Sequence, residues 1–188
     1  MIVNGWTLYT HPLFLDQVES LATAVEKARS KDPKNYQSSS NAKLLAQLNR
    51  LIFETIPLDP ARPEFRQGGT LGSSRKHWFR AKFGAGRFRL FFRYSSSAKI
   101  IVYAWVNDSD TLRAYGSKSD AFAVFMAMLD KGIPPEDWDE LLKSSATISA
   151  GSGFHQPSLP GDTCEFSWSV RSKPVTRFRL RYRSKPAR

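Results

Sequence analysis

The sequence of 188 residues has very little cysteine and no long apolar run. Its single cysteine, Cys164, excludes an intramolecular disulfide framework and a cysteine-rich zinc site. No apolar run approaches the roughly 18 residues that a membrane-spanning helix needs, and residues 1–12 lack the basic and then apolar pattern of a signal peptide. We therefore expect a soluble protein of the reducing cytoplasm, with no membrane contact.

Several chemical motifs are also missing from the sequence. There is no glycine-rich phosphate-binding loop, no GxSxG nucleophile motif and no cluster of histidine and cysteine ligands. Asp108, Asp110 and Asp120 are close together in the sequence, but aspartates in loops are usually turn and cap residues. We therefore expect neither a metal ion nor a cofactor.

Acidic residues are scarce in two parts of the chain, and these parts carry its positive charge. The 28 basic and 17 acidic residues give a net charge of +11, while 41% hydrophobic residues exclude a wholly disordered chain. Residues 62–99 hold ten basic residues and one acidic residue, and residues 151–188 hold eight and two. Residues 1–61 are neutral, and residues 100–150 carry net −4. Such a dense basic band attracts polyanions, of which nucleic-acid backbones are the commonest in a cell.

Apolar periodicity predicts helices on both sides of a central β-rich segment. A helix is expected from Pro12 until Asp32, and a second from a cap at Asn41 to the residue before Pro57. The apolar stripes of both helices are typical of core positions. Other expected elements are a short strand within residues 2–9, a helix over residues 119–131 and a helical turn over residues 134–142.

The middle of the chain predicts a three-stranded antiparallel meander. Polar and apolar residues alternate over residues 78–83 and 87–94, and residues 98–106 form a continuous apolar run. Helices before and after an antiparallel sheet are typical of a small α+β domain. We expect this domain over residues 1–143, with an N-terminal helical hairpin packed on the sheet and a C-terminal helix.

The rest of the chain differs in composition. Residues 144–161 are rich in Ser, Gly and Pro and are expected to form a linker, which is followed by a basic C-terminal extension over residues 162–188. Arginines alternate with apolar residues from Arg177 to Arg183. The extension is therefore either a solvated basic tail or an additional RNA-binding strand.

The first hairpin of the meander places basic residues on one face. Because alternate side chains of a strand share a face, we expect that face to hold, besides Phe91, the basic residues Arg80, Lys82, Arg87, Arg89 and Arg93. The other face is expected to consist of phenylalanine and leucine. A two-residue type II′ turn, with its glycine at Gly84, would place Arg80 opposite Arg89. Lys82 would then lie opposite Arg87.

Such a face is better suited to binding a polyanion than to facing water alone. Like charges directly opposite each other on a sheet cost from a few tenths to about 1 kcal/mol per pair, which a bound phosphate backbone would offset. RNA cleavage requires a base for the 2′-hydroxyl, stabilisation of charge on the phosphate and a proton for the leaving 5′-oxygen. Arginines suit the second task, a lysine among like charges suits the first, and Tyr115 or His77 can carry protons.

The sequence also resembles a known family. The matching segments are Asn4-Gly5-Trp6, Lys31-Asp32-Pro33 with Asn35-Tyr36, and residues 78–94, 105–108, 111–116 and 120–121. Together they span residues 3–143 in order and with near-constant spacing, and they resemble the YhaV toxins of the RelE/ParE superfamily. The resemblance implies a RelE/ParE-like fold and the toxin of a type II toxin–antitoxin system.

The same resemblance implies an activity, partners and a site. The expected activity is metal-independent cleavage of mRNA on the ribosome, with a 2′,3′-cyclic phosphate product and growth arrest. The expected partners are mRNA, a PrlF-type antitoxin of the AbrB-like kind and, for the toxin–antitoxin complex only, operator DNA. By position, the implied catalytic residues are Arg80, Lys82, Arg89, Arg113 and Tyr115. On and beside the basic hairpin we add Lys76, His77, Arg87 and Arg93 as expected RNA-binding residues. A non-catalytic ParE-like topoisomerase inhibitor or a nucleic-acid-binding regulatory module remains the alternative.

Overall fold

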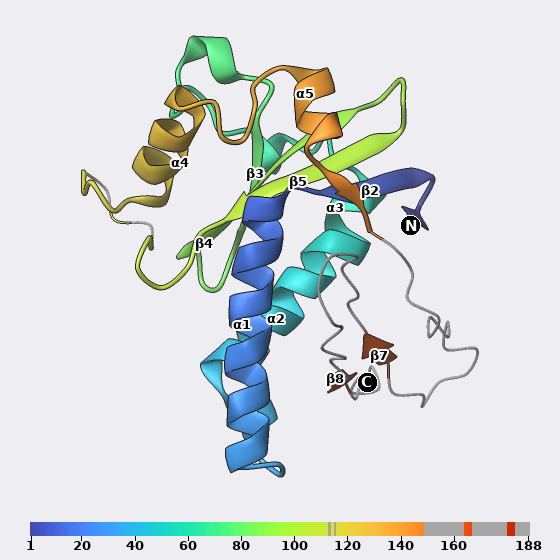
Figure 1. Ribbon diagram of the computed structural model, residues 1–188, viewed down its shortest axis with the longest axis vertical. Helices are drawn as coiled ribbons and strands as arrows, with labels where there is room; N and C mark the ends of the chain where they lie inside the picture. Colours follow the sequence, from blue (N-terminus) through green and yellow to red (C-terminus); the bar gives the residue numbers. More distant parts are fainter. Residues whose placement is uncertain (113, 115, 149–163, 167–179, 183–188) are drawn as a thin grey trace. The chain divides into compact units, whose positions relative to one another are not determined.

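The computed structural model describes residues 1–112, 114, 116–148, 164–166 and 180–182 (Figure 1). Residues 2–147 form one compact unit of the α+β class, as predicted. Its helices and strands are β1 (Ile2–Val3), β2 (Trp6–Thr10), α1 (Pro12–Lys31), α2 (Ser40–Arg50), α3 (Ile56–Leu58), β3 (Phe79–Phe83), β4 (Phe88–Ser95), β5 (Ile100–Val106), α4 (Ala121–Asp130), α5 (Trp138–Lys143) and β6 (Ala146–Thr147). In the C-terminal extension, β7 (Cys164–Phe166) pairs with β8 (Leu180–Tyr182) in an antiparallel two-stranded sheet.

The main sheet has the strand order β1-β2-β5-β4-β3. Strands β3, β4 and β5 form the predicted antiparallel meander, but β2 lies parallel to β5, so the expectation of a wholly antiparallel sheet was wrong. Parallel neighbours need a long connection, and here residues 11–99 lie between the two strands. Strand β6 pairs with β2 and thereby extends the sheet beyond residue 143, into the segment expected to be a linker.

The helices agree with the sequence in position but not at every end. Helix α1 has the predicted bounds within one residue. The cap of α2 is Ser39, whose side chain accepts from the Ala42 N–H, and not Asn41. The helical path then continues through a π-helical segment, Leu51–Thr55, and α3 past Pro57, which stands in the first turn of α3, where proline is tolerated. Helix α5 begins after its cap Asp137, later than the predicted start at Pro134.

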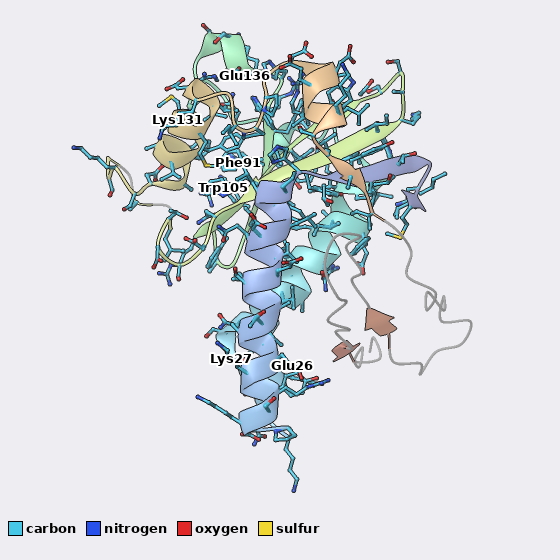
Figure 2. The ribbon with its side chains drawn as sticks, viewed as in Figure 1. Glu26, Lys27, Phe91, Trp105, Lys131 and Glu136 are labelled. Carbon is cyan, nitrogen blue, oxygen red and sulfur yellow. The ribbon has the colours of Figure 1, made fainter. Side chains whose placement is uncertain are left out.

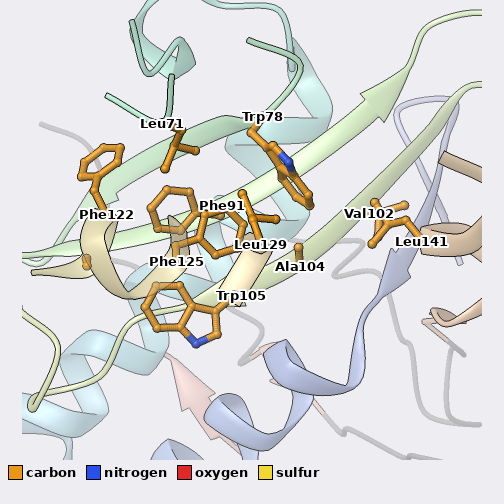
Figure 3. Close-up of a cluster of buried hydrophobic side chains, with 11 residues drawn as sticks. Leu71, Trp78, Phe91, Val102, Ala104, Trp105, Phe122, Phe125, Leu129 and Leu141 are labelled. Carbon is orange, nitrogen blue, oxygen red and sulfur yellow. The ribbon is translucent and has the colours of Figure 1, made fainter. Parts of the chain in front are cut away.

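Helices cover both faces of the sheet, and each side has its own core (Figure 1). Beneath α1 and α2, Tyr103 packs against Phe14 and donates its hydroxyl to the Ile52 carbonyl at 2.7 Å. Beneath α4, Phe91 stacks on Phe125 with ring centroids 4.1 Å apart (Figure 3). This second cluster consists of Leu71, Trp78, Phe91, Val102, Ala104, Trp105, Ala121, Phe122, Phe125, Leu129 and Leu141. The basic side of the hairpin is therefore also a core-forming side of the sheet.

A β-bulge shapes this second core. Phe91 pairs with Trp105 but the next residue, Phe92, pairs with Tyr103, so Ala104 is the extra residue of β5. A bulge lets consecutive side chains share a side, and both Ala104 and Trp105 belong to the cluster beneath α4. Figure 2 shows Phe91 and Trp105 at the sheet, well away from Glu26 and Lys27 on α1.

Candidate active site

The hairpin β3–β4 has a longer turn than predicted. Phe83 pairs with Phe88, which leaves four residues, 84–87, in the turn instead of two. Gly84, Ala85 and Gly86 adopt positive φ angles of 57°, 55° and 77°, and the Gly84 N–H donates to the Gln47 side chain of α2 at 2.9 Å. The contact with Gln47 and the packing of the Phe83 ring against the Phe88 ring both favour the four-residue turn. The local sequence preference predicted a two-residue turn instead.

The longer turn changes the cross-strand pairs by two residues. Lys82 lies opposite Arg89, and Arg80 lies opposite Phe91. The predicted Arg80–Arg89 and Lys82–Arg87 pairs were therefore wrong, whereas the assignment of the strand residues Arg80, Lys82 and Arg89 to one face is confirmed because a shift of two preserves it. One like-charge pair remains, Lys82 with Arg89, and Arg87 stands in the turn.

The face is not the nearly all-basic surface that we expected. Phe91 is fully buried beneath α4, and Arg89 is only 6% exposed. The Arg89 guanidinium donates through Nη1 to the carbonyls of Gly86 and Phe88, at 2.6 and 2.9 Å. Arg89 thus closes the turn from within, while Lys82 and Arg87 are exposed.

Arg80, Lys82, Arg87 and Arg89 form the basic part of the hairpin, here called the Lys82 group, and Lys82 is exposed within it. The charge of Arg80, slight burial and then the charge of Arg89 lower the pKa of Lys82 from its ordinary value. Arg80 is half-buried and donates through Nη1 to the Glu64 carbonyl at 2.8 Å, which holds its cation beside β3. A lysine with a lowered pKa in an exposed position can accept a proton from a substrate hydroxyl, and adjacent guanidinium groups suit a phosphate.

His77 and Arg93 belong to a second cluster. The Arg93 guanidinium donates to the Glu136 carbonyl at 2.6 Å and lies over the rings of Trp78 and Trp138. Burial, followed by the charge of Arg93, lowers the pKa of His77.

These contacts connect Arg93 to residues near α5. Arg75 adds ion pairs to Glu136 and Asp130, both at 2.7 Å. Of the expected RNA-binding residues, Arg93 is thus engaged within the domain, whereas Lys76 is exposed beside this cluster. The structure therefore does not bring His77 and Arg93 into the group around Lys82.

The predicted Arg113 and Tyr115 lie outside the described residues, and hydrogen bonds are described only for their neighbours in the sequence. Before them, the buried Asn107 donates to the Thr111 carbonyl at 2.9 Å. Between them in the sequence, the Ala114 N–H donates to one oxygen of Asp120 at 2.8 Å, and the other oxygen of Asp120 accepts from the Phe122 N–H and caps α4. The interpretation of Asp120 as a cap residue is confirmed.

The sequence predicted no role for Gln47, and it included Asn107 only as part of a segment that resembles the family. The signal for Asn107 was present, because a polar residue directly follows the apolar strand β5. The signal for Gln47 was absent, since its partner Gly84 lies 37 residues further along the chain. Within the described ranges, no three His, Cys, Asp or Glu side chains are grouped so that they could hold a metal ion.

Comparison with known proteins decides the family. Residues 8–146 match the sequence model of the YhaV toxins, described as a toxin with endonuclease activity, of a toxin–antitoxin system. This chain belongs to the YhaV family. The Ribonuclease toxin YhaV of Escherichia coli strain K12 is 50% identical over 144 residues, which cover 76% of this chain and 94% of that protein. The Toxin YhaV of Escherichia coli O157:H7 is similar to the same extent.

The YhaV match covers the unit that holds the hairpin. It includes β3, β4, β5 and α4, and therefore every residue of the Lys82 group. No solved structure is significantly similar to this chain. Among the helices of the described part, none is long and apolar enough to cross a membrane.

Proposed function

We propose that this YhaV-family toxin cleaves mRNA without a metal ion and uses Lys82 as the base that deprotonates the attacking 2′-hydroxyl. The observation that supports this role is an exposed lysine whose pKa is lowered by two arginines on the same face of the hairpin. The K12 relative is named a ribonuclease toxin, and we extend this activity to the present chain because the two are 50% identical over 144 residues.

In the proposed reaction, the neutral Lys82 amine takes the proton of the 2′-hydroxyl. The 2′-oxygen forms a bond to phosphorus, and the bond from phosphorus to the 5′-oxygen breaks. The products are a 2′,3′-cyclic phosphate and a 5′-hydroxyl, whose proton comes from Tyr115 in the role that the family resemblance implies. Arg80 stabilises the charge on the phosphate, together with Arg113 by the same resemblance, and the buried Arg89 contributes through the electrostatic effect of its charge.

The exposed basic residues near Lys82 support a path for the RNA backbone along this part of the hairpin. Arg87 projects from the turn next to it, and its exposed guanidinium suits a phosphate of the bound strand. Lys76 extends the basic surface beyond the other end of β3. We assign both to binding the RNA backbone, which carries no sequence information by itself.

Further proposals concern the cellular setting. We propose a RelE/ParE-like arrangement of the α+β domain, action in the cytoplasm on ribosome-associated mRNA, and growth arrest as the outcome. The antitoxin of this toxin–antitoxin pair is proposed to be a PrlF-type protein of the AbrB-like kind. Operator DNA is then bound only by the toxin–antitoxin complex. These statements rest on the family and not on the geometry of the hairpin.

The test is cleavage of labelled mRNA by the purified chain in EDTA, with and without ribosomes. We expect cleavage, with a 2′,3′-cyclic phosphate at the new end. Loss of cleavage in EDTA would contradict the metal-independent mechanism. Intact RNA together with trapped cleaved DNA would support the topoisomerase inhibitor instead.

Two substitutions at Lys82 separate a base from a phosphate ligand. Lys82→Ala removes both roles, whereas Lys82→Arg keeps the positive charge but replaces the amine with a group that does not deprotonate in this pH range. If Lys82 is the base, both Lys82→Ala and Lys82→Arg should lose cleavage. If Lys82 only binds a phosphate, Lys82→Arg should retain cleavage. Lys27→Ala, which removes one exposed positive charge from α1, is the matched control (Figure 2).

A further inference from the structure

Asn107 occupies an unusual position at the end of β5. It is only 3% exposed, and its backbone N–H donates to the Arg89 carbonyl, which continues the pairing of β4 and β5 by one residue. Its side-chain Oδ1 accepts from the Arg89 N–H, so both backbone groups of Arg89 are bound by this one residue. The side chain takes the place of a backbone carbonyl where the strand has ended.

The amide nitrogen of the same side chain binds further carbonyls. Nδ2 donates to the Thr111 carbonyl at 2.9 Å and reaches the Arg87 carbonyl at 3.5 Å. The loop that it holds is itself closed by Asp108, which accepts from the Thr111 N–H at 3.0 Å and from the Thr111 hydroxyl at 2.8 Å. One buried amide therefore connects the start of β4, the turn and the loop after β5.

This connection matters because Arg89 has little freedom of its own. Its guanidinium is bound to the carbonyls of Gly86 in the turn and Phe88 at the start of β4, and its charge acts on Lys82, so its place depends on where its backbone is held. A shift of about 1 Å in a catalytic group can reduce the rate about 100-fold. Alanine at position 107 would leave the buried Arg89 N–H without the acceptor that it now has, and the strand end would have to move to satisfy it.

We propose that Asn107 is a positioning residue of the nuclease, which holds the backbone of Arg89 and the loop of residues 108–111 in one arrangement and so keeps the Arg89 guanidinium beside Lys82. The inference rests on the proposed function, because it assigns Asn107 to the same site. Asn107 acts through Arg89 and does not itself touch the RNA.

Steady-state RNA cleavage by Asn107→Ala tests this role. We expect kcat to fall about 10- to 100-fold, with KM changed by less than about twofold, because the group that is displaced acts on the transition state. The control is Tyr103→Phe, which removes a buried hydrogen bond from the same strand on the opposite face of the sheet. A loss of activity no larger than that of Tyr103→Phe would overturn the proposal.

A double-mutant cycle gives a readout that a merely structural residue would not move. In an Arg89→Lys background, Asn107→Ala should cause little additional loss of kcat, because both substitutions disturb the same guanidinium. Losses that multiply would show that Asn107 acts independently of Arg89 and would refute the assignment. If Asn107→Ala does not fold, Asn107→Asp serves in its place, because it keeps an acceptor for the Arg89 N–H and loses the donors to the Thr111 and Arg87 carbonyls. Its loss of kcat should be smaller than that expected for alanine and should likewise not multiply with Arg89→Lys; losses that multiply would again refute the assignment.

The same measurements distinguish a failure of the proposed function from a failure of the positioning role. If the wild-type chain cleaves no RNA, or if Arg89→Lys retains full activity, then the proposed function or its site is wrong. If cleavage depends on Arg89 but not on Asn107, only the positioning role is wrong. Circular dichroism at the assay temperature checks that each variant is folded.

Discussion

Replacing Gly84 with alanine tests the turn that shapes the candidate site. Gly84 has a φ of 57°, and a Cβ added there would lie 2.5 Å from Cδ2 of Phe88 and 3.2 Å from Cδ1 of Leu44. Gly86 has a similar φ of 77°, but a Cβ added there would meet no atom within 4 Å. Comparing Gly84→Ala with Gly86→Ala therefore separates the free-energy cost of a left-handed backbone conformation from that of a steric clash.

The expected magnitudes follow from these two contributions. A left-handed residue with a side chain costs about 1–2 kcal/mol, and alanine recovers about 0.4–1 kcal/mol by restricting the unfolded chain. Gly86→Ala should therefore lower the free energy of unfolding by about 1 kcal/mol. Gly84→Ala adds an overpacking cost of about 1–3 kcal/mol against Phe88 and Leu44, which gives a total of about 2–4 kcal/mol.

Urea denaturation monitored by circular dichroism measures both variants. Ala85→Gly is the control, because Ala85 is exposed, has a φ of 55° and should change the stability by less than about 1 kcal/mol. Equal losses for Gly84→Ala and Gly86→Ala would refute the reasoning, because the close contact with Phe88 would then have no cost. We also expect Gly84→Ala to reduce RNA cleavage, since the turn supplies the Gly86 carbonyl that binds Arg89.

Three further predictions concern the charges of the domain. Because the cation of Arg80 lowers the pKa of Lys82, Arg80→Gln should raise that pKa and leave less neutral amine at a given pH, which lysine ¹³Cε NMR titration measures; an unchanged titration would contradict the coupling. Asp120→Ala should lower the free energy of unfolding by about 1–2 kcal/mol through loss of the cap, and Asp120→Ser, another good cap, should recover part of it in the same urea assay. Arg75→Met should lower the melting temperature, because the mostly buried Arg75 pairs with Glu136, and should make it less sensitive to salt, because the second pair of Arg75, with the exposed Asp130, is screened by salt; an unchanged salt dependence would argue against the Asp130 pair.

Several parts of the fold follow from local patterns. The apolar spacing after Pro12 and the stop at Asp32 predicted α1 to within a residue, because both signals lie inside the helix and its caps. Alternation over residues 78–83 and 87–94 predicted β3 and β4, which form at Phe79–Phe83 and Phe88–Ser95, and the faces of their side chains. These predictions depend on a period that the sequence itself contains.

The register of the hairpin could not be predicted from such local patterns. Gly84-Ala85 fits a two-residue turn by local preference, but Gln47 of α2 binds Gly84 and stabilises a four-residue turn. The parallel pairing of β2 with β5 likewise depends on how the intervening helices return the chain. Both features arise from contacts between residues far apart in the sequence.

The candidate site likewise has some features that the sequence determined and others that only the tertiary structure determined. The sequence by itself determined the family, the class of the fold and the presence of Arg80, Lys82 and Arg89 on one face, because composition, motif order and strand alternation are local properties. Only the tertiary structure decided which of these cations meets solvent. Arg89 is buried by the turn carbonyls and Asn107, and Lys82 remains exposed among like charges, because burial depends on what packs across the strands.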